Sequence, residues 1–199
     1  MSITTPNTVT VGTYSTAFNS TTSSVFCGGV GGLCQDGTLY AGQGGGKPLF
    51  VPRCDAGQAW NGIGCAGTRN GTMRWGDNVQ VGTLCPGVDC GNGKARSAAI
   101  AALGPQFEMA TYCESLTEGG LTDWYLPDRN EITHLYSVRL SGYLAGTFDA
   151  VSSNPYYVSS AEYDASKFWI GLFKSGGVGI HSKDSTAFPM WVRCVRTPS

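Results

Sequence analysis

Charged side chains are scarce in this sequence: only 14% of its 199 residues are Asp, Glu, Lys or Arg, and the formal net charge is -1. A chain with so little charge lacks the broad basic face through which proteins usually bind nucleic acid or anionic membranes. It also lacks a run of roughly 20 apolar residues, the length that a membrane-spanning helix needs. We therefore expect neither nucleic acid nor an anionic membrane as a partner, and no membrane insertion.

Residues suited to common catalytic chemistry are also few. The chain has two histidines. His134 lies in a helical pattern and His181 in a loop rich in Gly, Ser and Lys, so a structural or surface role explains each better than a general base does. No Gly-x-Ser-x-Gly motif is present. We expect no catalytic residues and no enzyme activity.

The motifs of calcium-dependent lectins are missing too. Such lectins hold calcium with a Glu-Pro-Asn or Gln-Pro-Asp loop and a Trp-Asn-Asp strand, because this hard cation needs several oxygen ligands. The nearest fragments here, residues 153–155 (SNP) and 60–62 (WNG), lack the acidic residues. We expect no cofactor and no metal at that site, and calcium in another loop remains an alternative.

Cysteine, by contrast, is plentiful: the chain has eight, none of them in a C-x-x-C pair, which favours disulfides over a metal site. Proximity along the chain favours three short-range bridges and leaves two cysteines for a long-range one, an arrangement among about 105 that eight cysteines allow. The expected pairs are Cys27–Cys34, Cys54–Cys65, Cys85–Cys90 and Cys113–Cys194. Such bridges imply an oxidising compartment, so we expect an extracellular or cell-surface protein.

The start of the chain bears on the route out of the cell. Residues 1–12 have neither the basic start nor the apolar run of a signal peptide. Either an export signal has been removed, or the protein is released by lysis, as phage parts are.

Glycine is the other abundant residue, with 29 in a chain that is 41% hydrophobic. This composition favours short strands joined by loops over long helices. Residues 1–47 are rich in Ser, Thr and Gly and predict an N-terminal arm or linker, whereas residues 48–199 predict one folded binding domain. Short strands are expected at 49–51, within 58–75, at 167–173 and at 191–195.

Two helices are expected. The first starts after Pro105 and ends at the glycine pair 119–120. The second starts after Pro127, with Asp128 as N-cap and Glu131 completing a capping box. Its predicted buried stripe consists of Ile132, Leu135, Tyr136 and Leu140.

A series of short motifs runs along the chain: Tyr112-Cys113, Gly119-Gly120, residues 123–127 (DWYLP), Asn130-Glu131, residues 156–162, Trp169, Phe173 and residues 192–196 (VRCVR). Taken in this order, they resemble the bacterial domain of unknown function 1566. That domain is also the C-terminal module of a bacterial collagen-like adhesin. The resemblance covers roughly residues 50–196.

The resemblance implies an α+β, C-type-lectin-like fold, loop-rich and disulfide-stapled, in which two helices flank small, twisted antiparallel sheets and Cys113 is bridged to Cys194. It implies an extracellular adhesin or receptor-binding tip domain that recognises a cell-surface glycan or host receptor. Relatives serve as glycan-binding adhesins, as pilus or phage tip modules, or as targets of diversity-generating retroelements. The alternative is a protein-binding or assembly module of a pilus, a phage fibre or a homo-oligomer such as a trimer.

The ligand-binding surface is expected in the strand and loop of residues 163–184. If Trp169, Gly171 and Phe173 face inward, as the resemblance suggests, the alternate residues face outward. They would form a mixed aromatic and basic patch suited to stacking on sugar rings or to a protein partner. The candidate residues are Tyr163, Lys167, Phe168, Ile170, Leu172, Lys174, His181 and Lys183. Burial of this row against the N-terminal arm or a neighbouring subunit is the alternative.

Other residues of the motifs are expected to be structural. Trp124 is expected in the core and Glu131 at a helix end. Glu162 is expected in a partly buried ion pair with Arg193 or Arg196.

Overall fold

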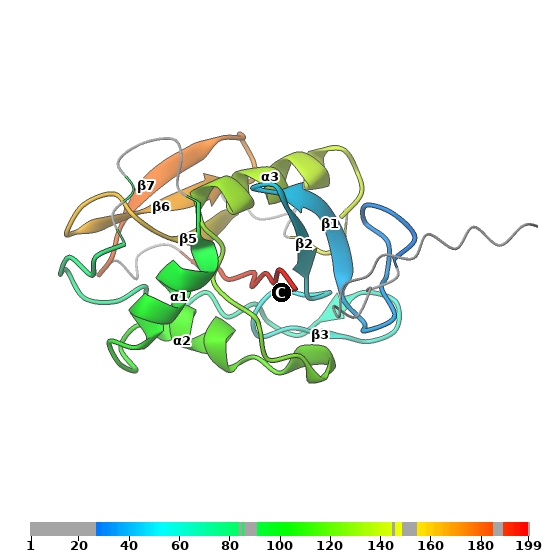
Figure 1. The fold of residues 1–199 in the computed structure, drawn as a ribbon, viewed down its shortest axis with the longest axis horizontal. Helices are drawn as coiled ribbons and strands as arrows, with labels where there is room; N and C mark the ends of the chain where they lie inside the picture. Colours follow the sequence, from blue (N-terminus) through cyan, green and yellow to red (C-terminus); the bar gives the residue numbers. More distant parts are fainter. Residues whose placement is uncertain are drawn as a thin grey trace, which may run out of the picture.

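The computed structural model describes residues 27–83, 85, 91–144, 146–148, 155–184 and 189–198. Within these residues the protein has a mixed α+β architecture of three α-helices, one 3-10 helix and eight short strands (Figure 1). In chain order the elements are β1 (Leu39–Gly44), β2 (Lys47–Val51), β3 (Ala59–Trp60), β4 (Cys65–Ala66), α1 (Gly93–Ala101), α2 (Glu108–Ser115), η1 (Glu118–Gly120), α3 (Arg129–Leu140), β5 (Tyr156–Glu162), β6 (Lys167–Leu172), β7 (Val178–Ser182) and β8 (Met190–Trp191).

The largest sheet has the strand order β7-β6-β5-β8. β6 pairs antiparallel with β5 and β7, and the short β8 adds to β5 in parallel. The β1–β2 and β3–β4 hairpins form separate two-stranded sheets. Figure 1 shows α3 between the largest sheet and the β1–β2 hairpin, with α1 and α2 side by side below it.

Two apolar clusters hold these elements together, one on each face of β5 and β6. On one face, Ile132 of α3 packs in a cluster with Tyr157 and Phe173. On the other face, Ile170 packs in a cluster with Trp75. Because both faces are covered, most residues of these two central strands are buried, whereas antiparallel sheets commonly keep one solvated face.

The helix predicted after Pro127 is confirmed as α3. Asp128 is its N-cap, and the backbone N–H groups of Asp128 and Glu131 each donate to the other residue's carboxylate at 2.8 Å, which completes the predicted capping box. Ile132 is buried as expected, but Leu140 at the C-terminal end is 69% exposed. The predicted stripe therefore identified the buried face of α3, but it did not show that burial ends before Leu140.

The helix predicted after Pro105 is confirmed as α2, although it ends at Ser115 and the glycine pair 119–120 lies in the separate η1. α1 was not predicted, because its sequence, GKARSAAIA, contains one large apolar residue and therefore no apolar stripe. It buries Gly93, Ser97 and Ile100 instead. No helix among the described residues is long and apolar enough to cross a membrane.

The expected boundary after residue 47 falls inside β2. Its partner β1 lies in the segment expected to be an arm, and the two strands pair Leu39 with Val51 and Tyr40 with Phe50. Leu39 also packs in the same cluster as α3. Residues 27–47 are thus part of the folded unit, and the rest of the expected arm, residues 1–26, lies outside the described residues.

Three of the four predicted disulfides are confirmed: Cys27–Cys34, Cys54–Cys65 and Cys113–Cys194. The last joins α2 to the final segment of the chain across 81 residues. Cys85 is disulfide-bonded as well, and its predicted partner Cys90 lies outside the described residues. The three bridges indicate an extracellular or secreted protein, since disulfides persist in oxidising compartments.

Candidate ligand-binding pocket

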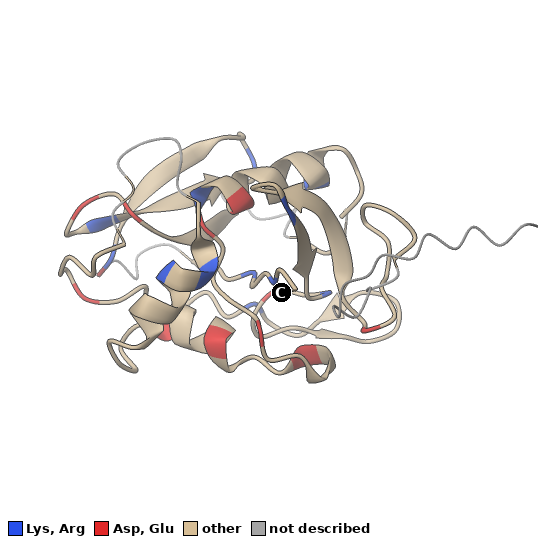
Figure 2. Ribbon diagram, in the orientation of Figure 1, with Lys and Arg blue, Asp and Glu red and all other residues tan. Residues whose placement is uncertain are grey.

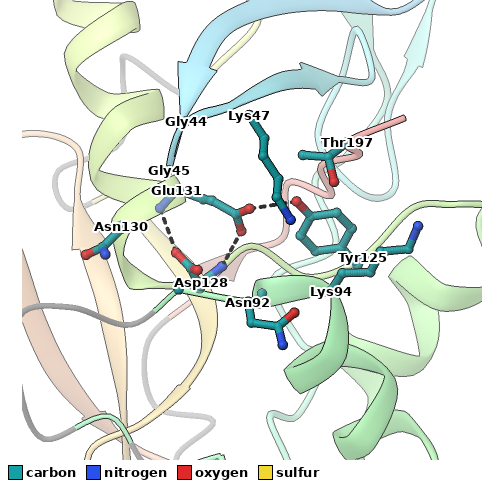
Figure 3. Close-up of a pocket in the computed structure, with 12 residues that line it drawn as sticks. Gly44, Gly45, Lys47, Asn92, Lys94, Tyr125, Asp128, Asn130, Glu131 and Thr197 are labelled. Carbon is teal, nitrogen blue, oxygen red and sulfur yellow. Dashed lines mark hydrogen bonds between the residues drawn. The ribbon is translucent and has the colours of Figure 1, made fainter. Parts of the chain in front are cut away.

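A polar pocket of about 200 Å³ lies where the β1–β2 turn, the start of α1 and the start of α3 meet (Figure 3). Such a cavity can hold a small polar group of a ligand. Figure 2 shows Lys and Arg residues on β2, on α1 and at the start of α3 around this region. The lining residues are Gly44, Gly45, Lys47, Gly91, Asn92, Gly93, Lys94, Tyr125, Asp128, Asn130, Glu131 and Thr197.

Two buried carboxyl groups and a tyrosine form one side of the pocket. Asp128 is 2% exposed and Glu131 is 7% exposed. The Tyr125 hydroxyl donates to Glu131 Oε1 at 2.6 Å, and the Asp128 backbone N–H donates to Glu131 Oε2 at 2.8 Å. These bonds fix the Glu131 carboxyl in one orientation, as Figure 3 shows.

The backbone around the pocket explains why these side chains meet. The N–H and C=O groups of Tyr125 both bond with Val195 at 2.9 Å, which anchors the tyrosine against the last segment of the chain. Gly93 at the start of α1 is so close to Glu131 that a Cβ there would lie 2.3 Å from Glu131 Oε2. Only glycine allows α1 to begin this near the carboxyl group. The preceding Asn92 has a left-handed backbone, with φ 82°.

Burial changes the acidity of this cluster. It raises the pKa of Glu131 to about 7, and the nearby charge of Asp128 adds to the increase. Burial also raises the pKa of Asp128, and it raises the pKa of Tyr125 with a further contribution from the charge of Glu131. With its pKa raised to about 7, the Glu131 carboxyl is partly protonated near neutral pH, and it can then donate as well as accept hydrogen bonds.

The rim supplies further polar groups. Figure 3 shows the Lys47 side chain extending toward Tyr125 and Glu131, whereas Lys94 and Asn130 point away from them. Next to Asn130 in the chain, Arg129 stacks its guanidinium 4.0 Å above the Trp169 ring. Neither Arg129 nor Trp169 lines the pocket itself.

The expected exposed apolar row is wrong. Phe168 is completely buried and Ile170 is 3% exposed, and both belong to the cluster that contains Trp75. Leu172 is half-buried and packs against the same cluster. The alternation along β6 was predicted correctly, but α1, α2 and the Trp75 segment cover the face that was expected to meet solvent.

Lys183, which was expected to bind ligand, is also buried. It is 1% exposed, and its ammonium group donates to Glu162 Oε1 at 2.5 Å and to the Val79 carbonyl at 2.7 Å. The ammonium lies 4.8 Å from the centre of the Trp75 ring. Lys183 therefore stabilises the interior and does not contact solvent.

The expected ion pair of Glu162 with Arg193 or Arg196 is wrong, because Glu162 pairs with Lys183 and both arginines pair with other carboxylates. Arg193 donates to Asp55 Oδ1 at 2.6 Å, and Arg196 donates to Asp123 Oδ1 at 2.7 Å. Trp124 is 1% exposed, so its expected place in the core is confirmed.

The other predicted ligand-binding residues do not form one patch. Tyr163 is 39% exposed and meets Trp169 edge to face, with ring centroids 5.2 Å apart. Lys167 is exposed and lies 3.7 Å from Asp164, and Lys174 is exposed. The half-buried His181 lies between the rings of Tyr156 and Phe168, at 6.4 and 6.1 Å.

Sequence reasoning missed the pocket because its residues come from four separate segments, around 44–47, 91–94, 125–131 and 197. Asp128 and Glu131 were identified only as helix caps. The capping motif beside a tyrosine was the available signal, but it does not show that a lysine and a glycine-rich turn lie opposite.

No three His, Cys, Asp or Glu side chains within the described ranges are grouped as metal ligands. In comparisons with known proteins, no family model and no curated protein sequence matches this chain.

Proposed function

We propose that this protein is an extracellular, non-catalytic domain that recognises a cell-surface glycan, and that a sugar binds in the pocket beside Glu131. The observation that carries the proposal is the pocket itself. Lys47 and Asn92 offer hydrogen-bond donors, and the carboxyl groups of Asp128 and Glu131 offer acceptors. Sugar hydroxyls both donate and accept, so a mixed set of this kind suits them.

A pair of aromatic side chains near the first residue of α3 supports the same ligand class. Trp169 is half-buried, with Arg129 over its ring and the exposed Tyr163 at its edge. Partly exposed aromatic rings offer apolar contact to the C–H faces of a sugar ring. Both residues of this aromatic pair lie in the segment where the sequence predicted a ligand surface.

The fold that we propose is C-type-lectin-like. Two features support it: α2 and α3 precede the strands β5 to β7, and the Cys113–Cys194 bridge ties α2 to the last segment. Both agree with what the resemblance to the bacterial domain of unknown function 1566 implies. A bacterial adhesin or a receptor-binding tip would use such a domain for noncovalent attachment.

A glycan array tests the pocket directly. We expect the oxidised protein to bind a restricted set of sugars, with or without a calcium chelator. Lys47→Ala should reduce affinity by about tenfold or more, because a charged hydrogen bond is lost. Lys174→Ala is the matched control, because Lys174 is an exposed lysine of the originally predicted surface. Equal effects of the two substitutions, or no binding by the wild type, would contradict the assignment.

The second candidate function is an assembly module of a pilus, fibre or homo-oligomer. Exposed apolar side chains near the end of α3 favour it: Leu140 is 69% exposed and Tyr143 is 59% exposed. Leu33, 51% exposed, lies in the neighbouring loop, where a Cβ on Gly31 would be 2.2 Å from the Tyr143 carbonyl oxygen. A light-scattering mass of a trimer or larger species that Leu140→Ser converts to monomer would favour this function.

A further inference from the structure

The β3–β4 hairpin presents an apolar tip that is separate from the pocket. Ile63 in its turn is 93% exposed, and Trp60 at the end of β3 is 38% exposed. Neither residue lines the pocket. A single exposed apolar residue is common on protein surfaces, so the tip is informative only because of how it is held and what surrounds it.

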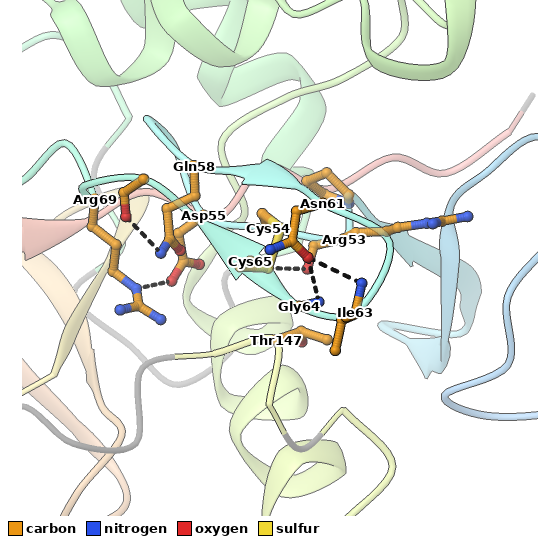
Figure 4. Close-up of a disulfide and its surroundings, with 12 residues drawn as sticks. Arg53, Cys54, Asp55, Gln58, Asn61, Ile63, Gly64, Cys65, Arg69 and Thr147 are labelled. Carbon is orange, nitrogen blue, oxygen red and sulfur yellow. Dashed lines mark hydrogen bonds and ion pairs between the residues drawn. A yellow bond between two sulfur atoms is a disulfide. The ribbon is translucent and has the colours of Figure 1, made fainter.

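The tip is held rigidly. The Cys54–Cys65 disulfide ties the hairpin to the preceding segment. The Asn61 side chain accepts hydrogen bonds from the backbone N–H groups of Ile63 at 3.0 Å and Gly64 at 2.9 Å (Figure 4). A turn whose backbone is already restrained in this way loses little backbone conformational freedom when it binds.

The charged residues around the hairpin lie at its base and not at its tip. Between residues 54 and 68 the charged residue is Asp55, which is 2% exposed and pairs with Arg69 and Arg193. The tip is therefore uncharged. At the base, the Arg53 guanidinium lies 5.3 Å from the centre of the Trp60 ring, and Figure 4 shows Arg53 and Arg69 on opposite sides of the hairpin.

We propose that this hairpin docks peripherally on an anionic lipid surface. Ile63 enters the boundary of the acyl chains, Trp60 lies at the level of the headgroups, and Arg53 faces the lipid phosphates. This order of apolar, aromatic and cationic groups matches the layers of a bilayer surface. An apolar cavity on a protein would accept Ile63 but would not require that order.

From the charge of the whole chain we expected no anionic-membrane partner, and the proposed contact is a local exception to that expectation. The formal net charge of -1 gives no attraction over the whole molecule. Arg69 is paired with Asp55, so the local contact relies on Arg53 at the hairpin base. One such cation can act there because charge attraction to a lipid surface acts within about a Debye length of roughly 10 Å. The hairpin then holds the domain at a membrane while the pocket remains available for another ligand.

Vesicle co-sedimentation of the oxidised protein tests the proposal. The probes are vesicles of phosphatidylcholine with phosphatidylserine and vesicles of phosphatidylcholine alone. We expect the wild type to bind the anionic vesicles more strongly and to lose binding as salt is raised. Ile63→Ser should lower binding by at least about tenfold, since one fully exposed isoleucine no longer enters the bilayer. Ile63→Leu should retain it.

The matched control is Ile180→Ser, because Ile180 is an exposed isoleucine of β7, 43% accessible. It should leave binding unchanged, and circular dichroism should show that both serine variants remain folded. Failure of the wild-type protein to co-sediment with either kind of vesicle would overturn the proposal. So would equal binding by the wild type and Ile63→Ser, or an equal loss in Ile63→Ser and Ile180→Ser.

Discussion

Replacing Glu131 by glutamine should flatten the dependence of stability on pH. The folded protein raises the pKa of Glu131 from an ordinary value of 4.5 to about 7, chiefly through burial. The folded state thus holds this proton more tightly than the unfolded state does. Its stabilising effect is complete below about pH 4.5 and is lost as the pH rises through about 7. The shift corresponds to roughly 3 kcal/mol of unfolding free energy as an upper limit, because the charge of the neighbouring Asp128 contributes to it.

The glutamine side chain does not ionise between these pH values, and it can still complete a capping box. We therefore expect Glu131→Gln to resemble the wild type at about pH 5 and to be more stable than it by about 1–3 kcal/mol at about pH 8. Urea unfolding at the two pH values measures the difference, with the slope of each transition checked for two-state behaviour.

Glu118→Gln is the control, because Glu118 is an exposed carboxylate of η1. It should shift the unfolding midpoint little at either pH. Two results would contradict the described titration of Glu131. One is a wild type with the same unfolding free energy at about pH 8 as at about pH 5. The other is a Glu131→Gln variant whose unfolding free energy changes with pH as much as that of the wild type.

Three further predictions, each with its own set of substitutions, test the interior. Lys183→Met should cost about 3–5 kcal/mol in urea unfolding because it leaves the Glu162 carboxylate buried without its cation, and Lys183→Met with Glu162→Gln should recover much of that loss. An equally large loss in the double variant would argue against the ion pair. Gly93→Ala should lower the melting temperature by several degrees, since its Cβ would fall 2.3 Å from a carboxylate oxygen; an unchanged melting temperature would mean that α1 is not so close. Replacing Cys113 and Cys194 together by serine should cost about 4 kcal/mol by the chain-entropy estimate, and calorimetry that showed no loss would contradict the long-range bridge.

Local signals in the sequence predicted local structure well. The capping residues Asp128 and Glu131 identified the start of α3, because a cap is a contact between residues only three positions apart. Proximity along the chain likewise identified Cys27–Cys34 and Cys54–Cys65. These features depend on short stretches of chain, so one sequence is enough to find them.

Features that depend on the packing of distant segments were missed. The alternation along β6 does not reveal that Trp75 and α1 cover the face that carries Phe168 and Ile170. Lys183 resembles a surface lysine until Glu162 is known to lie beside it. The sequence of α1 has small residues where a helix usually shows an apolar stripe, so its burial against α2 could not be read from periodicity.

The pocket illustrates the same limit at the functional level. Its carboxyl groups were recognised as caps, and the raised pKa of Glu131 follows from burial that only the folded chain creates. A polar pocket with a titrating carboxyl at its side is a common setting for ligand recognition.

Chemical-shift mapping with a sugar selected on the glycan array tests the central proposal most directly. We expect the backbone amide signals of Lys47, Asn92 and Tyr125 to shift as the sugar is added, with smaller shifts around Trp169. Shifts confined to the β6–β7 turn around Lys174, or the absence of any sugar that binds, would contradict it.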